Sequence, residues 1–249
     1  MTWINYKHGS LRIGITIALA VVATTVSATD DDKLPQPFEA TYSVSTLGAE
    51  VARSRWQLQR TSTDATLTVT TESSGLMALL RNETSVEQTR VTVRAGQLSP
   101  AEYSKVRSRG GKDKLTQLKF DWSKLRASGL SKNYPAALSV PQDAQDPLAY
   151  LLKFRSELAR DATATQYDYP VADAARLQTY SLRNLGSASA QTAIGTFDVI
   201  KFERHGRKQR VTTLWCARAL EYLPVRIDHV EKNGQVITLE IQQLRGLAR

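Results

Sequence analysis

The segment FEATYSV, residues 38–44, decides the fold, because its apolar and polar side chains alternate without interruption. The apolar members are two positions apart, which is the period of a β-strand with one buried face. The same alternation returns in residues 52–58 and 65–71 after short polar turns. These three segments predict consecutive strands of an antiparallel meander.

Alternating segments follow one another along most of the chain. Gly110-Gly111 predicts a hairpin between two of them, and Asn233-Gly234 predicts another near the C-terminus. Further strands are predicted at residues 86–93, 103–107, 118–122, 125–130, 167–171, 178–185, 197–203, 210–217, 223–230 and 237–241. We therefore predict a mainly β protein: a single antiparallel curved sheet or open half-barrel of about ten or more strands, with one main helix packed on it.

The helix is predicted to begin at Asp146, because Asp146-Pro147 combines an N-cap side chain with a proline suited to the first helical position. An apolar stripe of this helix is expected to contact the sheet. The stripe consists of Leu148, Leu151, Leu152, Leu158 and Ala159, with Lys153, Glu157 and Arg160 outside it. The preceding residues, 124–145, are long for an irregular loop, so part of them, near 125–130, is expected to form a strand.

Composition excludes several classes of protein. The chain has 249 residues, with 33 basic and 24 acidic side chains and a single cysteine, Cys216. One cysteine forms neither an intrachain disulfide nor a zinc site of several thiolates. A hydrophobic fraction of 41% supports a sizeable core and excludes a disordered or fibrous chain. Cys216 is expected to be a small buried apolar residue.

The N-terminal segment predicts a cleaved secretory signal peptide. A basic region that ends at Arg12 precedes the apolar residues 13–26, and small residues lead to Ala28. This apolar stretch is shorter than the ~20 residues that span a bilayer, so cleavage after Ala28 is favoured over a membrane anchor. We expect a periplasmic protein, not integral to a membrane, with a signal peptide at 1–28, a flexible leader at 29–37 and a single β-rich domain at 38–249.

Positive charge is concentrated in two hairpin-like segments, residues 105–114 and 201–210. Solvated loop tips are one interpretation of such runs, and contacts with an anionic partner are the other. The partners considered are an anionic lipid or other envelope component and an envelope protein. Nucleic acid is not expected, because no recognition motif is present. The side chains assigned to such contacts are Lys105, Arg107, Arg109, Lys112, Lys114, Arg204, Arg207, Lys208 and Arg210.

No motif of a catalytic or metal site occurs in the sequence. His205 is expected in a solvated loop and His229 in a strand as a packing residue, and a nucleophilic pair of either with Cys216 is disfavoured. Paired carboxylates need no short motif, because their required separation is spatial. The acids considered are Asp143, Asp146, Asp168 and Asp173, for which loop, cap and outward strand roles are preferred. We expect no enzymatic activity, no metal and no cofactor.

Several short segments, taken together and in order, carry a family resemblance. They are FEATY at 38–42 with Gly48 and the Trp56–Leu58 strand, SSG at 73–75, LSP at 98–100 with Tyr103, FDW at 120–122, QDPL at 145–148, LWCA at 214–217 and YLPVRI at 222–227. The chain resembles the bacterial domain-of-unknown-function family DUF3108. That resemblance implies an envelope protein with a signal sequence and a β-rich fold, and it supplies no catalytic residues. A looser likeness is to periplasmic lipoprotein carriers, whose open half-barrel encloses a helix and shelters acyl chains.

Three functional hypotheses follow. The leading one is a soluble, non-enzymatic periplasmic binding or chaperone-like protein, whose open barrel holds an amphiphilic or anionic envelope component, a lipid or lipoprotein-like ligand. The second is a structural or interaction protein with a filled core, which uses edge strands or basic loops in an envelope assembly. The third is a carboxylate hydrolase of envelope polysaccharide, which requires two acids in one cleft.

The signal-peptide prediction is tested by expressing the full gene in a bacterium and measuring the intact mass of the protein. We expect the mass of residues 29–249, because small residues precede the predicted cut. The substitution Ala28→Leu should slow cleavage, since a bulky residue fits the peptidase poorly. A purified protein that retains residues 1–28 would contradict this prediction.

Overall fold

The computed structural model describes residues 34–75, 78, 83–173, 176–206 and 209–247. The predicted signal peptide and most of the predicted leader lie outside these residues. The described strands are β1 (Phe38–Thr46), β2 (Ala49–Arg60), β3 (Asp64–Ser73), β4 (Glu83–Arg94), β5 (Gln97–Arg109), β6 (Lys112–Asp121), β7 (Arg126–Ser131), β8 (Tyr134–Ser139), β9 (Gln166–Asp173), β10 (Arg176–Thr192), β11 (Gly195–His205), β12 (Val211–Ala217), β13 (Leu223–Val230) and β14 (Val236–Arg245). The helices are α2 (Ala149–Arg160) and the short 3-10 turn η2 (Arg218–Leu220).

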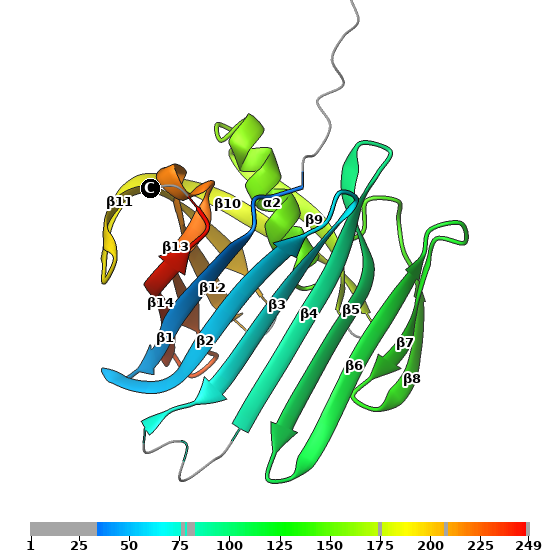
Figure 1. Cartoon of the computed structure of the whole chain (residues 1–249), viewed down its shortest axis with the longest axis horizontal. Coiled ribbons are helices and arrows are strands. Elements are labelled where there is room, and N and C mark those ends of the chain that lie inside the picture. Colours follow the sequence, from blue (N-terminus) through cyan, green and yellow to red (C-terminus); the bar gives the residue numbers. More distant parts are fainter. Residues whose placement is uncertain (1–33, 76–77, 79–82, 174–175, 207–208, 248–249) are drawn as a thin grey trace, which may run out of the picture.

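The fourteen described strands form one curved sheet (Figure 1). Every neighbouring pair is antiparallel, and spatial order follows chain order except where β1 lies beside β14. The edges are β8 and β9. The predicted antiparallel open barrel is therefore confirmed. The sequence did not predict β8. Its Pro135 lacks a backbone N–H, which an edge strand tolerates because one of its sides has no neighbouring strand.

Antiparallel pairing places the connections alternately at two ends of the sheet. The lower end in Figure 1 carries the turns after β1, β5 and β7, and the pairing register puts the connections after β9, β11 and β13 at the same end. The upper end carries the first residue of β1 and the last residue of β14, which lie side by side. Both basic segments predicted from the sequence therefore reach the lower end, at the β5–β6 and β11–β12 connections.

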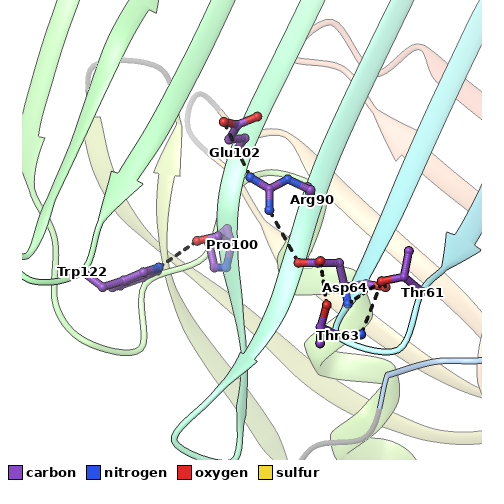
Figure 2. A network of polar contacts seen from close by, with 7 residues as sticks. All are labelled: Thr61, Thr63, Asp64, Arg90, Pro100, Glu102 and Trp122. Carbon is purple, nitrogen blue, oxygen red and sulfur yellow. Dashed lines mark hydrogen bonds and ion pairs between the residues drawn. The ribbon is translucent and has the colours of Figure 1, made fainter.

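The concave face of the sheet is apolar in its upper half, and the convex face is polar. The apolar members of residues 38–44 are all buried, as their alternation predicted. Tyr42 is fully buried, and its hydroxyl donates a hydrogen bond to the carbonyl of Pro224 at 2.9 Å. On the convex face, Arg90 of β4 pairs with Asp64 at 3.5 Å and with Glu102 at 3.6 Å, so one side chain links three strands (Figure 2).

Helix α2 lies inside the curve of the sheet rather than flat on one face (Figure 1). Its leucines are buried as predicted, and Phe154 packs edge-to-face on Phe202 of β11 at 4.8 Å. Two details of the predicted stripe were wrong: Ala159 is exposed, and Lys153 is buried. Arg155, for which no position was predicted, is buried as well. Enclosure by strands on several sides explains this, because even the polar side of the helix meets protein.

Buried cations on this helix reach polar atoms at the edge of the core. Lys153 Nζ donates to Oε1 of Gln97 in β5 at 3.3 Å. Arg155 Nε donates to the carbonyl of Glu221 at 3.0 Å, and its guanidinium lies over the Phe38 ring at 5.1 Å. Their aliphatic stems fill core space. The charge of Arg155 is balanced in part by Glu221, whose carboxylate lies 3.8 Å from Nη2, although neither Nη atom has a hydrogen-bond partner within the described residues.

The sheet is closed by the segment that precedes the helix. Gln145 N–H donates to Pro170 of β9 and its carbonyl accepts from Ala172, each at 2.8 Å, while its side-chain amide donates to Leu98 of β5 at 3.2 Å. Among the described strands, no ladder joins β8 to β9. The segment at residues 145–146 therefore ties β9 to the middle of the sheet, and we call it the seam.

Asp146 has a different position from the one its sequence context predicted. The helix begins at Ala149, so Asp146 is not its N-cap residue. Its carboxylate nevertheless accepts hydrogen bonds from the N–H groups of Leu148 and Ala149, both at 2.8 Å, and from the Thr89 hydroxyl of β4 at 2.5 Å. The Asp146 side chain thus joins the helix to the sheet, and it also accepts hydrogen bonds from N–H groups at the start of the helix.

The stability of the seam should depend on pH. Burial raises the pKa of Asp146 from 3.8 to about 7, against the opposing effect of the hydrogen bonds from Thr89, Ala149 and Leu148. A pKa raised by folding stabilises the protein at low pH, and this contribution is lost as the pH rises through the folded value. We expect the free energy of unfolding, measured with urea, to fall between about pH 4 and pH 8. In Asp146→Asn this fall should be smaller, and an identical pH profile for both proteins would contradict the assignment.

Candidate functional site

The lower half of the concave face carries a row of polar side chains. Register places Leu182, Arg204, Thr212 and His229 beside one another on β10, β11, β12 and β13. Neighbours in register point to the same side of a sheet. Because Leu182 is fully buried in the core, the other three side chains also point into the curve of the barrel.

These side chains line a cavity of about 560 Å³, which we call the bowl. Asp173 at the end of β9 and Tyr180 of β10 contribute to its wall, and Arg176 and Arg210 lie at its lower border. The floor meets helix α2, because the Tyr150 ring packs edge-to-face on Tyr180 at 5.1 Å. The bowl is therefore formed by five strands and the helix that fills the upper half.

Arg204 is the most unusual residue of the bowl. Its guanidinium lies 4.0 Å from the centre of the Tyr180 ring, a cation–π contact that holds the charge in place. Its Nε is shielded from solvent and has no hydrogen-bond partner in the described part of the chain. The pKa of Tyr180 is raised to about 12, because burial and the charge of Asp173 raise it more than Arg204 lowers it. The bowl thus presents a fixed cation with an unsatisfied donor beside a neutral phenol.

His229 lies across the bowl from Arg204 and is held by two contacts. Its Nδ1 shares a hydrogen bond with the Thr212 hydroxyl at 2.9 Å, and its Nε2 lies 3.5 Å from Oε1 of Glu231. Burial lowers the pKa of His229 below 6.5, Glu231 opposes this, and the charges of Arg204 and Arg210 lower it further. The imidazole is therefore neutral at pH 7 and adds hydrogen-bonding capacity without charge.

The first basic segment also faces the inside of the barrel. Thr89 lies beside Tyr103 in register, and both are buried, so Lys105 and Arg107, two and four positions further along β5, share their inward side. Inward acids on β4 neutralise them. Glu87 binds Lys105 at 2.8 Å and accepts the Tyr103 hydroxyl at 2.7 Å. Arg107 pairs with Glu83 at 2.5 Å.

The remaining bases assigned from the sequence differ in their pairing. Arg109 lies 4.0 Å from Glu83, and Arg210 pairs with Glu231 at 2.8 Å. Lys112 and Lys114 make no ion pair within the described ranges. Arg207 and Lys208 lie outside the described residues. Of the seven assigned side chains that the structure describes, Arg204 is thus the one that combines a place in the cavity wall with a shielded, unpartnered donor.

The candidate catalytic groups are not brought together as a reactive pair. Asp143 is exposed on a loop, Asp168 is exposed on the convex face as predicted, and Asp146 is buried in the seam. Cys216 is buried as predicted, and burial raises the pKa of its thiol to about 12 while Arg155 opposes this. In the described residues, no group of three His, Cys, Asp or Glu side chains is placed to hold a metal ion.

The comparisons with known proteins agree with this architecture. The model of the protein family of unknown function DUF3108 matches residues 38–242. The chain belongs to the DUF3108 family. No curated protein matches the sequence. A similar solved structure is the crystal structure of a beta-barrel-like protein of the domain of unknown function DUF1849 from Brucella abortus, with a TM-score of 0.56 and 10% identity over 84% of this chain and 97% of that chain. At that identity the likeness concerns the fold alone.

Part of the bowl of this DUF3108 protein was not predicted from the sequence. Tyr180, Thr212 and Asp173 lie in the cavity wall beside Arg204, although they are distant in the chain. The alternation of side chains within one strand indicates which residues share a face of the sheet. It does not indicate which residues of different strands lie together, and this depends on the pairing of β10 through β13. No helix in the described ranges is long and apolar enough to cross a bilayer.

The electrostatic coupling in the bowl is measurable by NMR titration of the histidine ring nitrogens. The pKa of His229 should lie below 6.5, the ordinary value for a histidine side chain, because burial and the nearby positive charges oppose its protonation. In Arg204→Gln the pKa of His229 should rise, because one of the positive charges that oppose its protonation is removed. An unchanged value in that variant would show that Arg204 does not act on His229.

Proposed function

We propose that this protein is a non-enzymatic binding protein of the bacterial periplasm, and that the bowl holds the anionic head group of an envelope amphiphile. The single observation that carries the proposal is Arg204. Its Nε is shielded, has no hydrogen-bond partner among the residues that the structure describes, and belongs to a side chain in the wall of the cavity. A shielded donor without an acceptor is costly, and a phosphate or carboxylate oxygen would satisfy it with a charge-assisted hydrogen bond.

The surroundings of Arg204 support recognition of one anionic group. Thr212 and His229 add hydrogen-bonding groups, and the neutral state of the imidazole avoids repulsion with the guanidinium. A cavity of about 560 Å³ is within the usual range for small-molecule sites. Helix α2 fills the upper half of the barrel, so we place the ligand in the lower half, with its head group on Arg204 and its apolar part towards the open end.

The experiment measures binding of a short-chain phosphatidylglycerol, which stays monomeric in water, by isothermal titration calorimetry. Arg204→Gln should weaken binding by at least about tenfold, because a hydrogen bond between charged groups is lost. The matched control is Arg183→Gln on the same sheet, because Arg183 lies on the convex face and pairs with Glu203 at 2.8 Å. This control should bind like the unchanged protein.

Two further arms identify what is recognised. Short-chain phosphatidylcholine carries no net charge and should bind more weakly, while inorganic phosphate should compete if the head group alone is recognised. Mass spectrometry of protein purified from the periplasmic fraction should reveal a co-purified anionic amphiphile. The proposal is overturned if no lipid accompanies the protein and none of the added probes binds, or if Arg204→Gln binds as tightly as the unchanged protein.

A further inference from the structure

The lower end of the barrel exposes apolar side chains on separate turns. Leu47, between β1 and β2, is 89% exposed, and Tyr134, at the start of β8, is 74% exposed. These are the two most exposed large apolar side chains in the described part of the chain. Leu177 and Val236, at 44% and 42%, begin strands at the same end. We call these four residues together with Lys112, Lys114 and Lys132 the rim.

Leu47 is an unexpected residue for its turn. It adopts a positive φ of 50° and is followed by Gly48 at 78°, a backbone conformation that favours Asn, Asp or Gly at both positions. A leucine here is strained, and at 89% exposure almost no contact within the chain compensates for the strain. A partner that buries this side chain would supply the missing compensation.

The lysines of the rim are available for an external anion. Lys112, Lys114 and Lys132 line a shallow depression of about 740 Å³ beside Tyr134. No ion pair engages any of them in the described ranges, and Asp113 is the one acid in the same lining. They differ in this from Lys105 and Arg107, which acids of β4 neutralise inside the barrel.

We propose that the rim docks on the surface of an anionic lipid bilayer. Leu47 and Tyr134 enter the interfacial region, and the three lysines contact lipid phosphates. Tyrosine and lysine side chains are favoured at that depth, because each combines an apolar body with a polar tip. The proposal does not depend on a ligand in the bowl, although Leu177 belongs to both the rim and the border of the bowl.

The distribution of the apolar residues favours a bilayer over a folded protein partner. Leu47, Tyr134, Leu177 and Val236 lie in or beside four different connections at the lower end, so they do not form one continuous segment. A stable protein interface needs a contiguous, well-packed apolar centre, whereas a membrane accepts separate anchors from one end of a rigid body, aided by attraction between bases and anionic lipids.

The test is flotation of the purified protein with vesicles of phosphatidylglycerol mixed with phosphatidylcholine, compared with vesicles of phosphatidylcholine alone. All variants carry the same N-terminus, so differences between them report on the rim. Replacing Lys112, Lys114 and Lys132 with Gln should weaken partition into the anionic vesicles by roughly 100-fold, since each base contributes about fivefold near such a surface. Leu47→Ser should weaken it by about tenfold.

The upper end supplies matched controls. Leu125 also has a positive φ, 48°, in an exposed turn, and Lys124 is 75% exposed beside it. Leu125→Ser and Lys124→Gln should leave partition unchanged. In a second readout, tryptophan emission of Leu47→Trp should shift to shorter wavelength when anionic vesicles are added, while that of Leu125→Trp should not.

The outcomes separate the two proposals. Partition that is equal for the unchanged protein and the rim variants, or emission of Leu47→Trp that does not shift, overturns docking by the rim. Equal losses in the rim and upper-end variants overturn it as well. Binding of monomeric short-chain phosphatidylglycerol in the bowl is measured without a bilayer, so its presence or absence judges the proposed function alone.

Discussion

The hydrogen bonds of Gln145 and Asp146 tie the β9 edge of the curved sheet to β5 and β4, and the closure of the barrel depends on them. The backbone of Gln145 pairs with β9, its side chain reaches β5, and Asp146 adds Thr89 of β4. A sheet that closes through a crossing segment brings polar backbone into the interior, where each group needs a partner. These two polar side chains supply such partners, which explains why they are fully buried among apolar neighbours. The helix follows the seam directly, so the same contacts fix it inside the barrel.

The position of the helix divides the interior into two chemical environments. Phe154 and the leucines of α2 complete an apolar core in the upper half. Helix α2 does not extend below Tyr150, and the inward side chains of the strands there include charged and polar groups. On one wall, Glu83 and Glu87 neutralise the bases of β5. On the other, Arg204 has no acidic partner in the described ranges, so the interior is asymmetric and a ligand anion is favoured on one side.

The sequence predicted most of the strands because alternation is a local property. It holds for residues 38–44 whatever their partners are, and twelve of the fourteen described strands contain a segment that was predicted from strand patterns. A thirteenth, β7, was predicted because residues 124–145 are long for an irregular loop. The missing strand, β8, is short and contains Pro135. The helix was located but placed three residues early. The Asp146-Pro147 pair indicates that a carboxylate accepts hydrogen bonds from the first N–H groups of a helix, but it does not indicate which N–H groups these are. The bowl could not be predicted, since Tyr180 and His229 come to line one cavity only through the pairing of four strands in register.

The number of basic residues in a segment therefore does not indicate which of them remain without an acidic partner in the folded protein. The two basic segments appeared equivalent in the sequence, yet register turns Lys105 and Arg107 towards acids and leaves Arg204 facing a tyrosine ring. Antiparallel hairpins bring both segments to one end of the barrel, so the mouth of the bowl and the uncompensated lysines of the rim face the same direction. An amphiphile that leaves a bilayer at the rim would meet Arg204 without crossing the apolar core. The topology thus places the two proposed sites at the same end of the barrel, although they consist of different residues except for Leu177.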